Sequence, residues 1–535
     1  MILRAIHAAL HRLDRPRVRA FEEALRYPEK AQAARLRGFL QANAGSAYGR
    51  AQGYADIHAV RDFQERVPVM DAAALEPWVA RIAAGEPGIL TTAPVRILET
   101  TSGSTSGSTR GSTGGDRLIP FTDAFLSEMR GALAPWMADL FRARPALRGL
   151  RQYWSISPAT GPRERTPGGV PIGMEDDLEY LGALGRAALR RVMAVPGTLA
   201  RTHDQGEWRR RTLLHLLAAE DLGLVSVWSP SFLTLLMDAL EPDLPAYLGQ
   251  LPPRRADAIR AGLDAQGRLT GEALWPHLQV ISCWADGPAA RQLTGLRAYF
   301  PHTPIQAKGL LATEGVVSFP LWGEEDRGSV AAASSHFLEF VDLEAPGAMP
   351  RLVHELQAGA LYTPLLTTGA GLSRYALRDA LRCTGHHGAL PFLRFEGKLD
   401  GVSDLAGEKL SPTRVEAALA GVAEALQLSL HFALLAPAVS ADSEPPRYLL
   451  FVESPSGDAE LDRLAEALDE ALSADHHYGH CRALGQLGSI APRRVQGGWA
   501  TWERVRVARG MRPGDVKPSS LDPWDGWEEI FAPPN

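Results

Sequence analysis

The sequence predicts an α/β protein with a large N-terminal body of mixed sheets and helices and a small α+β domain at the C-terminus. The 535 residues exceed the roughly 250 to 300 that one hydrophobic core usually organises, so more than one domain is expected. From residue 95, short apolar runs bounded by Gly, Pro and Ser alternate with helical stretches, which is typical of buried strands in an α/β body. Beyond about residue 400, helical and strand patterns alternate at shorter spacing, which indicates a separate compact domain.

Residues 1–90 are predicted to be helical, because apolar residues recur at helical spacing through 31–40 and 72–82. A further helix is expected at 232–240, where the same periodicity returns after a strand pattern. The short apolar runs predict buried strands at residues 95–98, 152–156, 224–228, 278–283 and 305–310.

The C-terminal pattern predicts a compact α+β arrangement. Glycine and charged residues gather at 397–407, which indicates a hinge. We therefore expect a domain at 1–400, with its helical part at 1–90, and a small mobile domain at 401–535. Within the second domain the expected helices are 412–425, 459–472 and 499–507, and the expected strands are 428–435, 448–452 and 489–495.

Composition excludes several classes of protein. Apolar residues make up 45% of the chain and charged residues 22%, which is ordinary for a packed globular protein and argues against wholesale disorder. The formal net charge of -6 gives no general positive field, so neither a nucleic acid nor a membrane is expected as a partner. Three widely spaced cysteines form neither a disulfide framework nor a metal cluster, and no apolar run is long enough to cross a membrane. We expect a cytoplasmic protein.

Lysine is rare in this chain. Only five of the 56 basic residues are lysines and the rest are arginines, a bias that GC-rich coding in a bacterium would explain. Each remaining lysine is therefore a candidate for chemistry that a planar guanidinium cannot perform. The five are Lys30, Lys308, Lys398, Lys409 and Lys517.

Residues 101–115 form an unusual run of Ser, Thr and Gly. By composition alone it is typical of a flexible linker. A predicted strand precedes it, however, and the apolar residues 118–121 follow it, leading to a helix that starts near Thr122. The run is therefore expected to join two ordered elements of one domain. Its backbone N–H groups and hydroxyls suit phosphate oxygens, although it lacks the ending of a Walker loop.

Further motifs follow in a fixed order. Gly-Leu-Leu-Ala-Thr-Glu-Gly at 309–315, Gly-Leu-Ser-Arg-Tyr-Ala-Leu-Arg-Asp at 371–379, Gly-Lys-Leu-Asp at 397–400 and Gly-Glu-Lys-Leu-Ser-Pro at 407–412 resemble the signature motifs of the adenylate-forming superfamily, which includes acyl-CoA synthetases, luciferases and peptide-synthetase adenylation domains. Together with residues 101–122, 169–181, 226–233 and the Gly-Asp-Val-Lys-Pro motif at 514–518, they look like the plant auxin-responsive Gretchen Hagen acyl acid amido synthetases and their bacterial relatives. The resemblance covers most of the chain.

The resemblance implies a ligase that uses ATP and Mg²⁺. Such an enzyme activates a small carboxylic acid as its acyl-adenylate, releases pyrophosphate and passes the acyl group to an amino acid or other amine. No covalent enzyme nucleophile is needed, in agreement with the absence of a Ser-His-Asp or Cys-His signature from the sequence. Two alternatives stay open: transfer of the acyl group to the thiol of CoA, and a nucleotide-binding protein whose lengthened loop has impaired catalysis.

The resemblance also implies residues that bind the nucleotide. Thr313 and Glu314 would line the nucleotide site, Glu314 would help to hold Mg²⁺, and Asp379 would accept hydrogen bonds from the ribose hydroxyls. Lys398 would belong to the same site, and Leu310 stands where a tyrosine often stacks on adenine. The Ser/Thr/Gly run would hold the phosphates in one of two registers, either with Ser104 and Thr105 or with Gly111, Ser112, Thr113 and Gly114.

Two further roles follow from the resemblance. A lysine of the small domain would stabilise the charge that develops as the carboxylate attacks the α-phosphate. Lys517 is the favoured candidate and Lys409 is its rival. Trp228, Ser229 and Gly173 are expected to border the acyl site.

Overall fold

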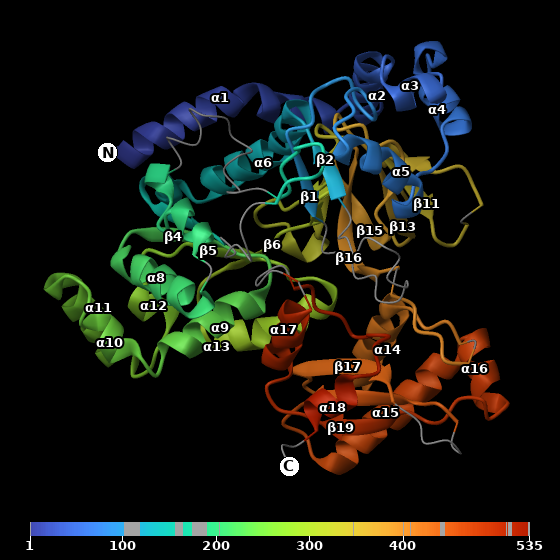
Figure 1. Ribbon diagram of the computed structural model, residues 1–535. Coiled ribbons are helices and arrows are strands. Elements are labelled where there is room, and N and C mark those ends of the chain that lie inside the picture. The colour runs from blue at the N-terminus through green and yellow to red at the C-terminus, as the bar shows by residue number, and fades with distance from the viewer. Residues whose placement is uncertain are drawn as a thin grey trace.

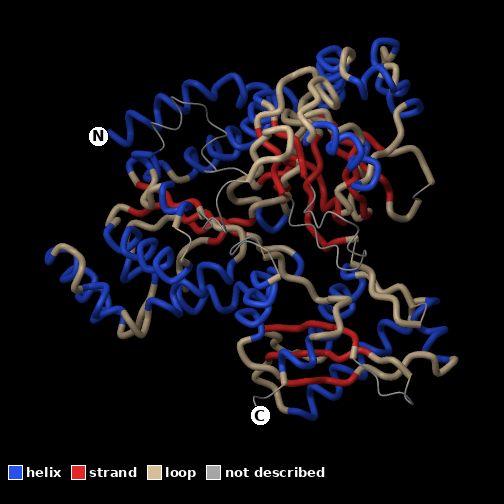
Figure 2. Tube along the Cα trace, viewed as in Figure 1, coloured by secondary structure: helices blue, strands red, loops and turns tan. Residues whose placement is uncertain are grey.

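The protein has a large body and a smaller C-terminal part that lies beneath the body in Figure 1. The computed structural model describes residues 2–100, 118–155, 164–173, 190–202, 204–345, 347–399, 401–406, 408–438, 445–509, 511 and 516–532. Figure 2 shows that the strands gather in separate places, with helices around each group.

Helices begin the body. Pro28 stands in the first turn of the second helix, where its missing N–H costs no hydrogen bond, and the Asp71 carboxylate accepts a hydrogen bond from the Ala74 N–H at 2.9 Å at the start of the fifth. The helical stretches predicted at 31–40 and 72–82 are confirmed. The helices are α1 (Ile2–Ala24), α2 (Pro28–Asn43), α3 (Ala47–Ala51), α4 (Val60–Arg66) and α5 (Ala72–Ala83), with a 3₁₀ turn η1 (Tyr54–Asp56) between α3 and α4.

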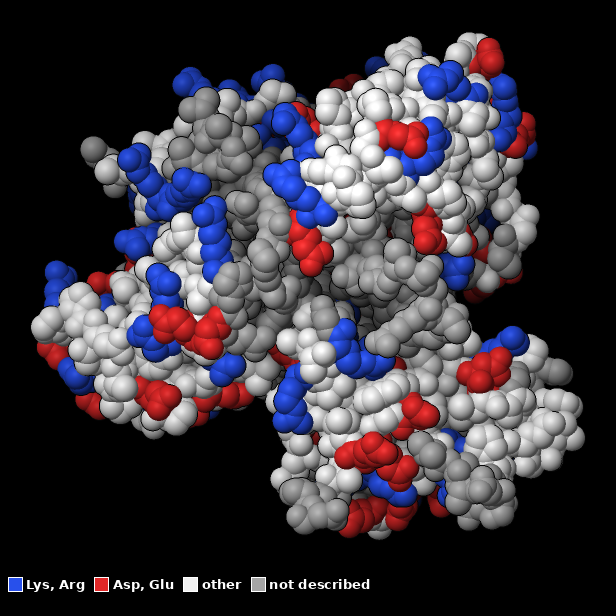
Figure 3. All heavy atoms as spheres, viewed as in Figure 1, with Lys and Arg blue, Asp and Glu red and all other residues white. Residues whose placement is uncertain are grey.

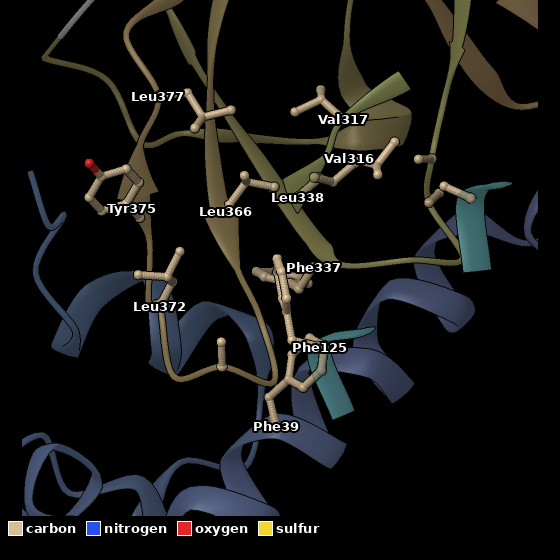
Figure 4. Close-up of a cluster of buried hydrophobic side chains, with 14 of the residues drawn as sticks. Phe39, Phe125, Val316, Val317, Phe337, Leu338, Leu366, Leu372, Tyr375 and Leu377 are labelled. Atoms are coloured by element: carbon tan, nitrogen blue, oxygen red, sulfur yellow. The ribbon is translucent and has the colours of Figure 1, made fainter. Parts of the chain in front are cut away.

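An antiparallel sheet of eight strands forms the centre of the body, in the order β12-β11-β13-β15-β16-β10-β9 with β14 paired to β13. The sequence patterns did not predict it, because several of its strands are only two or three residues long and β15 contains polar residues and bulges. Figure 4 shows part of the core around it, where Phe39 of α2 and Phe125 of α6 lie near Phe337, and where Leu338 and Leu366 lie side by side on paired strands. The strands are β9 (Ser318–Phe319), β10 (Ser329–Ala331), β11 (Phe337–Asp342), β12 (Arg351–Leu352), β13 (Leu361–Thr367), β14 (Tyr375–Ala376), β15 (Asp379–His387) and β16 (Leu390–Lys398), with the 3₁₀ turns η6 (Glu325–Arg327) and η7 (Val353–Glu355).

A second sheet in the body is parallel, in the order β3-β4-β5-β6. Its strands are β3 (Arg151–Trp154), β4 (Leu222–Ser226), β5 (Val280–Cys283) and β6 (Ile305–Ala307), which confirms the strands predicted near these positions. The sixth strand is shorter than predicted, because Gly309 adopts a φ of 72°, and a Cβ there would lie 2.6 Å from the carbonyl oxygen of Ser318.

Helices cover both faces of the parallel sheet. Leu140 of α6 packs on Leu224 and Val280 on one face, and the helices between the strands provide the core of the other. These elements are α6 (Asp123–Ala143), α8 (Gln205–Ala218), α9 (Pro230–Leu240), α10 (Leu244–Leu248), α11 (Pro253–Gln266), α12 (Gly271–Leu274) and α13 (Leu293–Tyr299), with the 3₁₀ turns η2 (Pro145–Gly149), η4 (Gly197–Arg201) and η5 (Gly287–Gln292).

The Ser/Thr/Gly run joins two ordered elements, as predicted, and these are two strands that pair with each other. β1 (Ile97–Thr100) and β2 (Leu118–Phe121) are antiparallel, and Thr100 lies opposite Leu118 at the end of the ladder. Thr122 then begins α6, because its hydroxyl accepts a hydrogen bond from the Phe125 N–H at 3.2 Å. Ser104, Thr105, Gly111, Ser112, Thr113 and Gly114, which were predicted to bind phosphate, lie outside the described residues.

The C-terminal part is an α+β unit around a three-stranded sheet in the order β17-β18-β19. One face of the sheet packs on α14 and α15 and the other on α17 and α18. The strand predicted at 428–435 begins later, at Phe432, after Gln427 has taken a positive φ of 55°. The elements are α14 (Pro412–Ala425), β17 (Phe432–Pro437), β18 (Tyr448–Glu453), α15 (Asp458–Ser473), α16 (His476–Ala483), β19 (Ala491–Arg494), α17 (Gly498–Ala508) and α18 (Trp527–Phe531).

The surface carries charges of both signs. On the face shown in Figure 3, acidic and basic side chains occur both on the body and on the C-terminal part. Among the helices that the structure describes, none is long and apolar enough to cross a membrane.

Candidate active site

A short hairpin presents Glu314. Thr313 and Glu314 form the turn between β7 (Leu311–Ala312) and β8 (Gly315–Val316). The backbone of Gly315 lies against His336, since a Cβ at this glycine would be 2.8 Å from the Nε2 atom of that ring. A side chain at position 315 would therefore displace the turn.

Buried polar groups support the hairpin from behind. His336 is fully buried, and its Nδ1 atom lies 3.1 Å from a carboxylate oxygen of Glu128. Glu128 also accepts a hydrogen bond from the Gly369 N–H at 2.9 Å. The turn that carries Glu314 thus rests on a histidine held by α6 and by the loop that precedes the 371–379 motif.

Asp379 and Lys398 form an ion pair at the ends of two central strands. Asp379 is the first residue of β15 and lies directly opposite Lys398, the last residue of β16. The Lys398 ammonium contacts the Asp379 carboxylate, which is only 1% exposed. Apart from this ion pair, neither oxygen of Asp379 accepts a hydrogen bond from the described residues. The carboxylate therefore retains the capacity to accept hydrogen bonds from a ligand.

The electrostatics of Glu314 connect it to these two residues and to Lys517. Burial raises the pKa of Glu314, and the Lys398 and Lys517 ammonium groups oppose this rise, whereas the Asp379 charge adds to it. Lys517 is positioned from the C-terminal part, where Trp502 of α17 donates a hydrogen bond to its carbonyl oxygen at 3.3 Å. The Lys517 ammonium of the C-terminal part is therefore close enough to act on the charge of Glu314 in the body.

Lys409 lies elsewhere. It has a positive φ of 48°, its side chain is 64% exposed, and its ammonium is 3.6 Å from the carboxylate of Asp404. The structure thus brings Lys517, and not Lys409, into the group around Glu314.

An ion pair between the two parts fixes this arrangement. The guanidinium of Arg291, in η5 of the body, binds both carboxylate oxygens of Glu416 in α14, at 2.8 and 2.6 Å. The two side chains are 12% and 11% exposed, and the hydroxyl of Ser520 contacts both. Ser520 lies close to Lys517 in the chain, so this ion pair helps to position Lys517. No sequence motif distinguished Arg291 from the many other arginines.

The residues predicted to border the acyl site lie in different surroundings. Trp228 is partly exposed after β4, and its ring centroid is 5.9 Å from that of Trp284. The Ser229 hydroxyl is buried and donates to the Gln292 amide oxygen at 2.8 Å, which gives it a local structural role. Gly173 has a φ of 77° and donates its N–H to the carbonyl of Leu98 in β1.

Two carboxylates of this region could hold parts of a magnesium nucleotide. No group of three or more His, Cys, Asp or Glu side chains among the described residues forms a metal site. Mg²⁺ is usually held by one or two carboxylates together with substrate phosphates, and Glu314 can supply such a carboxylate. Asp379 offers a buried pair of acceptors for a diol.

Comparison with known proteins gives consistent matches along the chain. Family models match residues 17–252 (GH3 family N-terminal domain), 329–398 (GH3 family central domain) and 413–521 (GH3 family C-terminal domain). A probable indole-3-acetic acid-amido synthetase GH3.12 of Oryza sativa subsp. japonica is 25% identical, over 93% of this chain and 92% of the relative. The jasmonoyl--L-amino acid synthetase JAR6 of Nicotiana attenuata is 22% identical, over 90% and 88%.

Solved structures have the same fold. The AtGH3.15 acyl acid amido synthetase in complex with 2,4-DB matches with a TM-score of 0.81 at 18% identity, over 95% of this chain and 94% of that one. A 2-hydroxyisobutyryl-CoA ligase in the postadenylation state matches with a TM-score of 0.51 at 15% identity, over 94% and 90%. These likenesses confirm the predicted fold class, an adenylate-forming α/β body with a smaller C-terminal domain.

Proposed function

The chain belongs to the GH3 family, and from this premise we propose that it is an ATP-dependent acyl acid amido synthetase. It activates a small carboxylic acid as acyl-AMP with release of pyrophosphate and then transfers the acyl group to an amino acid or other amine. A carboxylate does not react with an amine at neutral pH, because oxide is a poor leaving group, whereas AMP is a better one. The observation that carries the proposal is the buried Asp379–Lys398 ion pair, whose charges act on Glu314 together with that of Lys517 from the C-terminal part.

Asp379 and Glu314 have distinct roles in this proposal. The two oxygens of Asp379 accept hydrogen bonds from the ribose hydroxyls, and the adjacent Lys398 remains beside the nucleotide. Glu314 holds Mg²⁺, which, when bound, neutralises charge on the triphosphate. The turn formed by Thr313 and Glu314 is kept in place by His336 behind Gly315, so the carboxylate is oriented before the nucleotide arrives.

Lys517 is the electrostatic catalyst in this proposal. As the acid attacks the α-phosphate, negative charge grows on the phosphate oxygens, and an ammonium held in place stabilises it. Residues 401–535 move as a unit about the hinge at 397–407 to deliver this group. The Arg291–Glu416 ion pair favours the closed position, because it joins the body to α14 and both side chains contact Ser520, which is close to Lys517 in the chain.

The relatives support the choice of substrates. One is named a probable indole-3-acetic acid-amido synthetase and another a jasmonoyl-L-amino acid synthetase, and the solved AtGH3.15 acyl acid amido synthetase structure is described as a complex with 2,4-DB. We propose a small carboxylic acid and an amino acid for this chain too. A cytoplasmic location is supported by Cys283, Cys383 and Cys481, which are free thiols, as is usual in a reducing compartment.

Pyrophosphate release tests the proposal. The purified protein is incubated with ATP, Mg²⁺ and a panel of small carboxylic acids, and acid-dependent pyrophosphate release is expected for at least one of them. Amino acids or CoA are then added separately, and mass spectrometry identifies an amide or a thioester. ATP binding without pyrophosphate release from any acid would instead favour a nucleotide-binding protein, and a thioester product would favour an acyl-CoA synthetase.

A further inference from the structure

The parallel sheet carries a buried ammonium group at its carboxyl edge. Lys308 follows β6, is only 3% exposed and donates a hydrogen bond through its ammonium to the Ser226 hydroxyl at 2.6 Å. The chain continues from Lys308 through β7 to Glu314. Ligands of α/β proteins bind preferentially at the carboxyl ends of parallel strands, so this is a favoured place for a binding site.

Three tryptophan rings surround this ammonium. Its nitrogen lies 5.0 Å from the ring centroid of Trp228, 5.2 Å from that of Trp136 and 5.5 Å from that of Trp154. Cation–π attraction holds an ammonium well at such distances. Trp136 is fully buried, whereas Trp154 and Trp228 are partly exposed.

Buried glutamines fix two of the rings. The indole N–H of Trp136 donates to the side-chain oxygen of Gln306 at 2.9 Å. The indole N–H of Trp154 donates to the side-chain oxygen of Gln152 at 3.0 Å. The rings are therefore held in place, as the walls of a binding site must be.

A row of polar side chains crosses the sheet beside Lys308. Trp154, Ser226, Ser282 and Gln306 are register neighbours on β3, β4, β5 and β6. The Ser282 hydroxyl and the Gln306 amide nitrogen are buried and have no hydrogen-bond partner among the described residues. Buried donors of this kind are unfavourable unless an acceptor reaches them.

The groups at this edge are mainly donors. The Ser226 hydroxyl accepts from Lys308 and keeps its own hydrogen to donate, Gln306 has an N–H₂ without a partner among the described residues, and the Lys308 ammonium beside them carries a positive charge. Together they suit a strong hydrogen-bond acceptor, best an anionic one, and the flat tryptophan faces suit an aromatic or extended apolar body.

We propose that Lys308, Ser226 and Gln306 bind a second acceptor group at the far end of the acyl acid, so that the preferred substrates are acids with a distal carboxylate or hydroxyl. This inference rests on the proposed function, because it concerns the acid that is activated beside Glu314. It assigns to Lys308 a role in substrate specificity.

Matched acids test this inference. Benzoate is compared with 4-hydroxybenzoate and 4-carboxybenzoate, and hexanoate with hexanedioate, by tryptophan fluorescence titration without ATP and by the kcat/KM of pyrophosphate release. The substituted acid is expected to be preferred by about 10- to 100-fold, the range for a hydrogen bond to a charged group. The comparison of 4-hydroxybenzoate with 4-carboxybenzoate shows whether the site prefers a neutral or an anionic acceptor group.

Variants assign the preference to Lys308. Lys308→Met keeps the apolar stem and removes the charge, and it is expected to bring the preference for the substituted acid close to one. Lys30→Met is the matched control, because Lys30 is an exposed lysine of α2 whose side chain is 80% accessible, and it should keep the wild-type preference. Ser226→Ala provides a second variant if Lys308→Met does not fold, and it should reduce the preference in the same direction.

The outcomes separate the two proposals. A wild-type protein that prefers the unsubstituted acids, or a Lys308→Met variant that weakens both members of each pair equally, would overturn the specificity site. Selective binding of the substituted acids without pyrophosphate release would keep the site and reject the ligase function. Pyrophosphate release without any preference for the substituted acids would keep the ligase function and reject the specificity site.

Discussion

At the scale of single residues, Asp379 gives the most direct test. Burying a carboxylate this deeply costs folding free energy unless the carboxylate is paired. Lys398 provides one partner, and we propose that the ribose hydroxyls provide the others. Asp379→Ala should therefore weaken ATP binding by about 2 to 4 kcal/mol, measured by calorimetry. Asp379→Asn keeps the shape and should weaken binding less. Unchanged ATP affinity in the alanine variant would exclude the assignment.

Lys517 and Lys409 make a matched pair at the same scale. Lys517→Ala should slow adenylate formation by about 10²- to 10³-fold, the range for loss of one preorganised donor, whereas Lys409→Ala should have little effect because its side chain is exposed beside Asp404. Lys517→Arg should restore little of the rate of adenylate formation, since the arginine side chain is longer than that of lysine and its guanidinium is planar. Single-turnover pyrophosphate release measures this step.

The second half-reaction gives the control for Lys517. Amide formation from chemically supplied acyl-adenylate should survive in Lys517→Ala, because the charge that this lysine stabilises has already gone. Normal adenylation in Lys517→Ala together with a defect in Lys409→Ala would move the role to Lys409.

The carboxyl group of Asp286 is expected to make the stability of the folded protein depend on pH. Burial raises its pKa from 3.8 to about 6, and the guanidinium of Arg394 only partly opposes the rise. A raised carboxyl pKa means that the folded state favours the protonated form. The resulting stability is fully present below about pH 4, the unfolded value, and is lost as the pH rises to about 6.

Asp286→Asn removes this titration. The free energy of unfolding of the wild type should fall relative to that of the variant between pH 4 and pH 6, by at most about 3 kcal/mol. Urea denaturation at several pH values measures the difference. Parallel pH profiles for the two proteins would show that Asp286 does not titrate in this window.

At the scale of elements, the β1–β2 ladder makes the length of the Ser/Thr/Gly run adjustable. Thr100 pairs with Leu118, so the two ends of the run are held at a fixed separation whatever lies between them. Shortening a flexible loop by several residues changes its closure free energy by only a fraction of about 1 kcal/mol. Deletion of residues 101–108 should therefore leave a folded protein that still releases pyrophosphate, with the phosphates held from Gly111 onward.

The deletion also decides between the two phosphate registers. If the shortened protein keeps its melting temperature but no longer releases pyrophosphate, Ser104 and Thr105 are the phosphate ligands. Conversion of Ser112 and Thr113 to alanine in the full-length chain gives the complementary test. If Ser104 and Thr105 hold the phosphates, this double substitution should leave pyrophosphate release intact.

At the scale of the whole molecule, the Arg291–Glu416 ion pair couples the two parts of the chain. Its removal should disfavour the closed arrangement that places Lys517 near Glu314. Arg291→Met leaves a buried carboxylate without its partner, a change that typically costs 2 to 5 kcal/mol at an interface, so adenylation should slow by about 10-fold or more. Amide formation from supplied acyl-adenylate should be spared.

The neighbouring Arg414 provides the control for this prediction. It lies on the same helix as Glu416 but pairs with Asp475 within the C-terminal part, at 2.8 Å. Arg414→Met should therefore leave adenylation near the wild-type rate. Equal effects of the two variants on adenylation would mean that the loss reflects general destabilisation and not the contact between the parts.

The sequence alone was sufficient for the family, the fold class and the order of the motifs, because these depend on residues close together in the chain. Helix periodicity, the Thr122 cap and the apolar runs of the parallel sheet are local signals, and the helices and strands formed where they indicated. The central antiparallel sheet was missed, since two-residue strands such as β12 and β14 are too short to show an alternating apolar pattern.

Tertiary structure decided which side chains meet. The sequence favoured Lys517 and left Lys409 as its rival. In the folded chain the Lys517 ammonium lowers the pKa of Glu314, whereas the Lys409 side chain is 64% exposed beside Asp404. No sequence motif includes Arg291 or Lys308. The residues that contact them belong to elements far apart in the chain. Burial, ion pairing and cation–π contact are properties of three-dimensional neighbours, and a linear pattern does not contain them.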